Sequence, residues 1–177
     1  MRQGGLIIIP TDTVYGVAAH WENTAAVGML RRIKHRPVDK PIPILVSDCM
    51  KIKNMKAHFG RKAGELAKRF WPGPLTLVLP VNDGWEGFRI PKHPVALAII
   101  EAAGGRLRVT SANLSGSRPA LTADEALGQF PDGVDLAIDY GPAPGGVPST
   151  VVKITGEKVA ILREGAIPGK EIYAALN

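Results

Sequence analysis

Twenty glycines and fifteen prolines, spread from one end to the other, most constrain how this 177-residue chain can fold. Together they make up about one-fifth of the residues, against roughly 12% in average usage. Both residue types interrupt helices and strands, so an even spread of them limits the chain to short elements joined by turns. No composition shift marks a linker, and we therefore expect one domain over residues 1–177.

The segments between these turns alternate between short apolar runs and helical patterns. A sheet of about seven short strands is expected, and eight segments are candidates for them: 6–9, 42–46, 75–79, 88–90, 107–109, 134–138, 150–154 and 159–162. Helices are expected after Asn23, in two pieces within 48–70, over 95–103, after the capping pair Thr122 and Glu125, and after Pro168. This order predicts the α/β class: a single domain with a mixed, twisted sheet covered by helices.

Charge and cysteine content narrow the class of partner. The chain carries 22 Lys and Arg against 16 Asp and Glu, and the net charge of +6 favours anionic partners such as nucleotides, small carboxylates or RNA. Cys49 is the only cysteine, so no intramolecular disulfide framework can form. No apolar run is long enough for a membrane span or a signal peptide, and we expect a soluble, cytoplasmic protein with no membrane partner.

Several common catalytic motifs are absent from the sequence. It contains no G-x-x-x-x-G-K-[ST] loop, no G-x-G-x-x-G fingerprint, no H-E-x-x-H and no G-x-S-x-G. The four histidines lie far apart, without the spacing of metal ligands, and no protein metal site is expected. Any phosphate site in this chain must therefore be built from other groups.

Polar segments follow or end many of the expected strands. PTDTVYG at 10–16 and TSANLSG at 110–116 each follow an apolar run, and Arg163 ends one. FRIP at 88–91 places Arg89 just before a proline, and GGVPST at 145–150 is a loop that ends in Ser149 and Thr150. Ligands of α/β proteins commonly lie at strand ends, so these segments are candidates for one binding site. The alternative for each is a turn in which Ser, Thr, Asn or Asp side chains bond to their own backbone.

A basic run, RRIKHRPVDK at 31–40, ends the first expected helix. Pro37 favours an extended conformation at Arg36, and in an extended chain Lys34 and Arg36 point the same way. Such a pair could present two cations to one phosphate. The alternative is a solvated run of cations that complements the negative end of the helix dipole.

Taken in order, six segments resemble the YrdC-like family: PTDTVYG, the K-x-R of RIKHRPVDKP, FWPGPLTLVLP, RIPKHP, TSANLSG and PSTVVKI with ILREGAI. The resemblance runs from about residue 4 to residue 167, and it implies the short, single-domain form of that family. Its best-known members are threonylcarbamoyl-adenylate synthases. The resemblance therefore implies that L-threonine, bicarbonate and ATP, accompanied by Mg²⁺, give threonylcarbamoyl-adenylate and pyrophosphate. A separate transferase complex would then modify an adenosine of tRNA.

The same resemblance implies roles for individual residues. The resemblance implies that Lys34 and Arg36 are catalytic residues that bind the phosphates. Those implied to bind the nucleotide are Arg36, Lys40, Ser111, Asn113 and Arg163. Those implied to bind threonine are Thr13, Arg89 and Ser149, with Thr11, Tyr15 and Thr110 lining the same pocket. Leu45 stands where some relatives carry a histidine, and the run around Trp85 also departs from the family pattern.

Two alternative functions stay open at this stage. One is an RNA-binding module of the same family, with weak tRNA binding, although aromatic residues are only 6% of the chain and none interrupts the run at 31–40. The other is a paralogue that acts on another carbamoyl compound, as in hydrogenase-maturation proteins.

Overall fold

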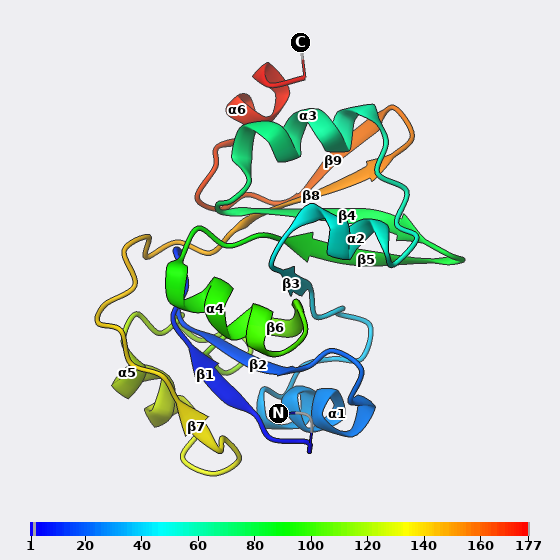
Figure 1. The fold of residues 1–177 in the computed structure, drawn as a ribbon. Helices are drawn as coiled ribbons and strands as arrows, with labels where there is room; N and C mark the ends of the chain where they lie inside the picture. Colours follow the sequence, from blue (N-terminus) through cyan, green and yellow to red (C-terminus); the bar gives the residue numbers. More distant parts are fainter. Residues whose placement is uncertain (2, 177) are drawn as a thin grey trace.

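A nine-stranded mixed sheet runs through the computed structural model, which describes Met1 and residues 3–176 (Figure 1). The strands are β1 (Ile7–Ile9), β2 (Gly16–His20), β3 (Ile44–Val46), β4 (Leu75–Val81), β5 (Gly84–Arg89), β6 (Arg106–Ser111), β7 (Leu136–Ala137), β8 (Thr150–Thr155) and β9 (Lys158–Arg163). The helices are α1 (Thr24–Ile33), α2 (Cys49–Lys53), α3 (Arg61–Phe70), α4 (Pro94–Ala102), α5 (Ala123–Gln129) and α6 (Gly169–Ala174). The predicted α/β class with one mixed sheet is confirmed.

Local capping signals fix several helix boundaries where the sequence predicts them. The Asn23 side chain accepts a hydrogen bond from the backbone of Ala26 at 2.9 Å, which begins α1. Thr122 begins α5 in the same way. Gly104 and Gly105 have φ angles of 94° and 87° directly after α4, a backbone region that glycine enters without strain. The predicted ends of these helices are therefore confirmed.

The sheet contains more strand structure than the sequence predicts, and β2 is the main difference. It lies between β1 and β6 and pairs antiparallel with both. Its sequence, GVAAH, lacks the run of large β-branched residues by which strands are recognised. A Cβ atom on Gly16 would lie 2.7 Å from the side chain of Val109, so the close packing of β2 against β6 requires glycine here. The same glycine makes the strand hard to recognise from the sequence.

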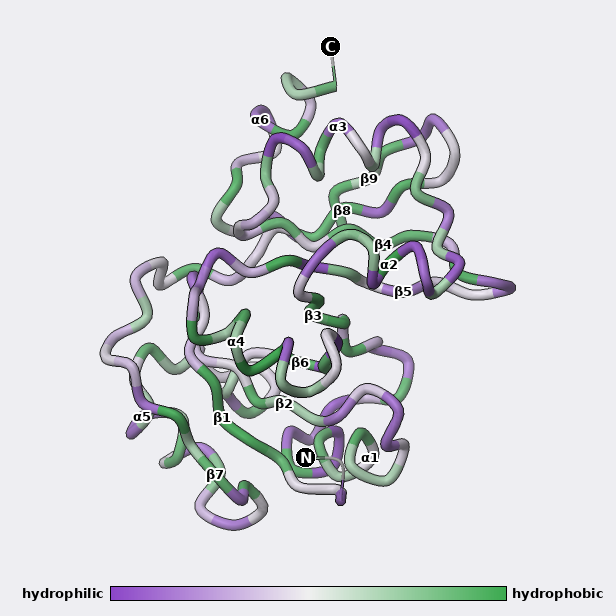
Figure 2. The backbone as a smooth tube through the Cα atoms, viewed as in Figure 1, coloured by the Kyte–Doolittle hydropathy of each residue, from purple (hydrophilic) through white to green (hydrophobic). Residues whose placement is uncertain are grey.

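The sheet has two halves with different surroundings. In the β1 half, formed by β7, β1, β2 and β6, both faces are covered: α1 and α5 pack on one face, and α4 crosses the other (Figure 1). In the β4 half, formed by β3, β5, β4, β8 and β9, α2, α3 and α6 cover a single face. Figure 2 shows hydrophobic residues along β1 and α4, as expected of elements buried in this way.

Alternation along the strands leaves the second face of the β4 half available for a site. In β4, Leu75, Leu77 and Leu79 are fully buried in the core beneath the helices. The intervening Thr76 and Val78 point to the opposite face, because successive side chains of a strand alternate.

None of the described helices is long and apolar enough to cross a membrane.

Candidate active site

A cavity of about 620 Å³ lies over the open face of the β4 half, and loops of the β1 half close its other side. Its apolar wall includes Leu45, Val78, Val109 and Val151. Of the residues predicted to bind ligands, all except Lys34 and Asn113 line it: Thr11, Thr13, Tyr15, Arg36, Lys40, Arg89, Thr110, Ser111, Ser149 and Arg163. The strand-end segments predicted to share a site do converge, although their roles toward ligands stay predictions.

One end of the cavity carries cations that bond only to neutral groups. Arg36 donates to the backbone carbonyls of Lys40 at 3.1 Å and Pro41 at 2.8 Å. Arg163, the last residue of β9, donates to the Ser149 carbonyl at 2.7 Å. Burial lowers the pKa of Arg36, and the charges of Arg31 and Arg163 lower it further. Positive groups that repel one another in this way are suited to binding a polyanion between them.

The predicted side-by-side arrangement of Lys34 and Arg36 is wrong. Lys34 caps α1 with φ −86° and ψ −6°, and His35 adopts φ 50°, so this stretch is not extended. The Lys34 ammonium group is buried and donates to the backbone carbonyls of Ser111 and Asn113. Pro37 restricts only the residue directly before it, which explains why its effect does not reach Lys34.

The other end of the cavity is organised by Arg89, the last residue of β5. Its guanidinium group is buried and donates to the Gly73 carbonyl at 3.0 Å and to the Thr13 hydroxyl at 3.0 Å. A third bond, 2.6 Å long, joins it to the Asp12 carboxylate. Burial lowers the pKa of Arg89, the negative charge of Asp12 opposes that shift, and the positive charge of Arg163 adds to it. The contacts hold the guanidinium in one orientation.

Hydroxyl groups extend this end of the cavity. Thr11 and Thr13 share a hydrogen bond of 3.0 Å between their side chains, and Thr11 also donates to the Val14 carbonyl. Ser149 shares a hydrogen bond of 2.9 Å with Thr76 of β4, although these residues lie far apart in the sequence. These side chains provide donors and acceptors of the size that a small polar ligand requires.

The side chains of Tyr15 and Asn113 form their hydrogen bonds with residues outside the cavity wall. The Tyr15 hydroxyl donates to the Gly141 carbonyl at 2.7 Å, and burial raises its pKa. Because Gly141 does not line the cavity, the phenol group is directed away from it. Asn113 donates to the carbonyls of Leu114 and Ser117, and its buried side-chain oxygen has no hydrogen-bond partner among the described residues. That oxygen could accept a bond from a ligand that reaches it.

Two further contributions to the site carry little signal in the sequence. Asp12 is one of several polar groups in PTDTVYG, and its pairing with Arg89 cannot be predicted because the two residues lie 77 positions apart. Thr76 was assigned to an apolar strand, although the strict alternation of β4 would have placed it on the face opposite Leu75 and Leu77.

The acidic residues of the described chain do not form a metal cage. Within Met1 and residues 3–176, no group of three or more His, Cys, Asp or Glu side chains lies close enough to hold an ion. Asp39 is the carboxylate among the cavity-lining side chains. The described residues therefore do not fit a resident Mg²⁺ ion.

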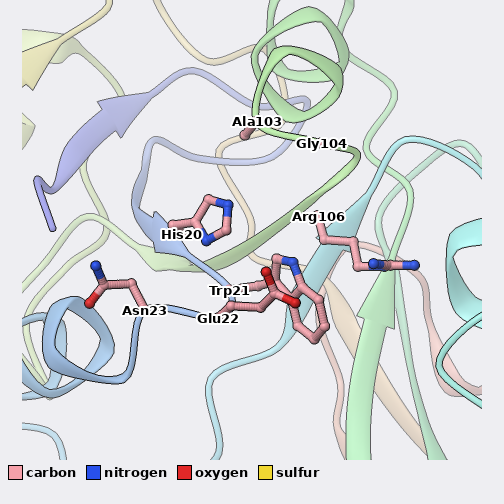
Figure 3. A pocket seen from close by; sticks show the side chains of 7 residues that line it. All are labelled: His20, Trp21, Glu22, Asn23, Ala103, Gly104 and Arg106. Atoms are coloured by element: carbon pink, nitrogen blue, oxygen red, sulfur yellow. The ribbon is translucent and has the colours of Figure 1, made fainter. Parts of the chain in front are cut away.

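A second hollow lies at the far side of the β1 half (Figure 3). It is lined by the segment from His20 to Asn23, by the residues after α4 and by Arg106. The Arg106 guanidinium lies over the Trp21 ring, 4.9 Å from its centre. None of the strand-end motifs contributes to this hollow, and we assign the candidate site to the first cavity.

An α/β protein with a cationic end and a hydroxyl-lined end in one cavity can bring a polyanion and a small polar molecule together. The chain belongs to the Sua5/YciO/YrdC family, whose model, described as telomere recombination, matches residues 1–165. The predicted membership of the YrdC-like family is therefore confirmed.

Individual proteins that are similar to this chain support the family assignment. The chain is 37% identical over 189 residues to the threonylcarbamoyl-AMP synthase of Bacillus subtilis (strain 168), covering all of this chain and 54% of that protein. It is 34% identical over 187 residues to a putative threonylcarbamoyl-AMP synthase of Mycobacterium tuberculosis (strain ATCC 25618 / H37Rv), covering all of this chain and 86% of that one.

A solved structure shows the same architecture. The structure of P. abyssi Sua5 complexed with L-threonine superposes with a TM-score of 0.93 at 34% sequence identity. The match covers 99% of this chain and 54% of that one. The chain thus spans about half the length of the B. subtilis and P. abyssi relatives.

Proposed function

We propose that this chain is a nucleotidyltransferase that makes threonylcarbamoyl-adenylate and pyrophosphate from L-threonine, bicarbonate and MgATP. The observation that carries the proposal is the cavity itself, with unpaired cations at one end and a fixed arginine among hydroxyl groups at the other. The proposal takes residues 1–177 as one YrdC-like domain. Threonylcarbamoyl-AMP synthases among the relatives, and the L-threonine complex of Sua5, support this choice of substrates.

In this proposal, each end of the cavity binds one substrate. Arg36, Lys40 and Arg163 neutralise the phosphates of ATP, and Ser111 adds a hydroxyl donor beside them. Arg89 retains two unused N–H groups, one on each terminal nitrogen, for the carboxylate of threonine. The shared cavity would then hold the amino group of threonine near the α-phosphate.

The chemistry requires positioning more than side-chain reactivity. The amine of threonine and bicarbonate form a carbamate with loss of water, and a carbamate oxygen attacks the α-phosphorus as pyrophosphate leaves. No covalent enzyme intermediate is needed, which agrees with the absence of nucleophile motifs from the sequence. Orientation of the reactants and neutralisation of phosphate charge would account for the catalysis. Transfer to tRNA by a separate complex in the cytoplasm completes the proposal.

The test is threonine-dependent release of pyrophosphate from ATP, with the adenylate product identified by mass spectrometry. Arg36→Ala should lower kcat/KM roughly 10- to 100-fold, because a charge-assisted hydrogen bond contributes about 1.5–3 kcal/mol. Arg32→Ala is the matched control: Arg32 lies near the end of α1, four residues before Arg36, is exposed and does not line the cavity.

Other outcomes of this assay would favour the alternatives. Pyrophosphate release that does not need threonine would favour a paralogue acting on another carbamoyl compound. Salt-sensitive tRNA binding with no ATP turnover would favour an RNA-binding module.

A further inference from the structure

The four cations that line the cavity fall into two electrostatic classes. Arg89 forms an ion pair of 2.6 Å with Asp12, and the two side chains are only 7% and 10% exposed. Arg36, Lys40 and Arg163 form no ion pair with a carboxylate among the described residues. The cavity therefore has one arginine that is paired with a carboxylate and three cations that form no ion pair. Arg163 lies between the two classes, since its charge acts on both Arg36 and Arg89.

This difference matters because the proposed substrates differ in charge. A di- or triphosphate carries several negative charges and is attracted most strongly by cations that no carboxylate compensates. A neutralised arginine attracts it much less. It can still bind a singly charged carboxylate through directed hydrogen bonds, and Arg89 has two N–H groups left for this after bonding to Gly73, Thr13 and Asp12.

We propose that Asp12 is a specificity-determining residue that keeps phosphate groups out of the amino-acid end of the cavity. The inference rests on the proposed function and deepens it. Asp12 acts through Arg89 by cancelling its charge while fixing its orientation. Without Asp12, the cavity would present a continuous row of cations, and pyrophosphate or the phosphates of ATP would compete with the amino acid.

The test measures L-threonine binding by isothermal titration, with and without saturating pyrophosphate and with no magnesium present. In the unmodified chain, pyrophosphate should change the Kd of threonine by less than about 3-fold, because the two ligands occupy different ends. In Asp12→Asn, the side-chain oxygen can still accept the bond from Arg89, but the negative charge is lost. Pyrophosphate should then compete with threonine and raise its apparent Kd at least 10-fold.

The matched control is Asp39→Asn, which removes a carboxylate from the cavity wall without unpairing Arg89. In this variant pyrophosphate and threonine should remain non-competitive. Thermal denaturation of both variants establishes that they are folded. A merely structural role for Asp12 would weaken threonine binding whether or not pyrophosphate is present, and this outcome would overturn the inference.

Binding measurements on the unmodified chain alone can test the inference separately from the proposed function. If threonine binds and pyrophosphate displaces it competitively, the inference is overturned while the proposed function stands. If threonine does not bind the unmodified chain at all, the proposed function fails, and the inference fails with it. Equal competition in the unmodified chain and in Asp12→Asn would also overturn it.

Discussion

The Lys34 side chain is a buried charge held by backbone carbonyls. Its ammonium group donates to Ser111 and Asn113, which ties the end of α1 to the segment that follows β6. Burial, together with the nearby charge of Arg36, lowers the pKa of Lys34 to about 8. The contact thus fixes the TSAN segment beside the cavity, but it keeps a cation where the charged form is disfavoured.

This shift predicts that the chain becomes more stable as pH rises from about 8 toward the ordinary lysine value of 10.5. In that interval the folded state has already lost the Lys34 proton while the unfolded chain still binds it, so the free energy of unfolding increases with pH. The measurement is urea unfolding of the unmodified chain and of Lys34→Met at several pH values.

The stability difference between the two proteins should move in favour of the unmodified chain across this interval. Lys53→Met is the control, since Lys53 is exposed on α2 and its substitution removes a lysine without removing the buried ammonium group. A pH-independent difference for Lys34→Met would contradict the prediction.

Single residues also show what the sequence could predict of the site. Residues such as Arg89, Ser111 and Arg163 could be placed at one site because each ends a strand, and strand ends meet at few places in a sheet. The pairing of Asp12 with Arg89 and the inward turn of Lys34 could not be predicted. Both depend on which distant atoms lie nearby once the chain has folded.

At the scale of elements, neighbouring residues of β4 have different roles: one face of the strand contributes to the core, and the other face lines the cavity. Leu77 is fully buried in the core beneath the helices, whereas Val78 lines the cavity. Leu77→Ala should lower the free energy of unfolding by roughly 2–5 kcal/mol, because it leaves a cavity in a packed core. Val78→Ala should cost less than about 1.5 kcal/mol, since its side chain faces an existing cavity.

Urea unfolding measures both costs, and titration of threonine and ATP measures binding. Val78→Ala should alter ligand affinity more than Leu77→Ala does in the folded protein. Equal losses of stability would show that the two faces of β4 are not as different as the structure indicates.

Elements differ in how well the sequence predicts them. α1 and α5 could be predicted because Asn23 and Thr122 are capping residues that act within a few positions of the chain. β2 could not, because its small residues become a strand only between two partners. The sequence predicts a strand only over 88–90, but residues 84–87 also pair with β4 as a hairpin. In both cases, tertiary pairing overrides weak local preference.

At the scale of the whole molecule, the cavity joins the two halves of the sheet. Thr11 and Thr13 come from the loop after β1, while Ser149, directly before β8, and Arg163, the last residue of β9, belong to the other half. A ligand that spans the cavity therefore contacts both halves. Because such a ligand binds only the folded state, it should stabilise the entire molecule.

ATP and threonine together, each at about 100 times its Kd, should raise the free energy of unfolding by at least about 2.7 kcal/mol. For a chain of this size, that corresponds to a rise in Tm of roughly 5–10 °C. Differential scanning calorimetry should show one transition that moves as a unit. Two transitions, of which only one responds to the ligands, would contradict the role assigned to the cavity in joining the halves.

The position of Arg163 on β9 bears on how activity arises during protein synthesis. β9 pairs only with β8 and lies at the edge of the sheet, so the cation it carries takes its place among the last parts of the fold. A nascent chain that already contains Thr13 and Arg36 still lacks Ser149 and Arg163 until residues 149–163 have been added. The wall of the cavity is therefore complete only once the β8–β9 hairpin has folded.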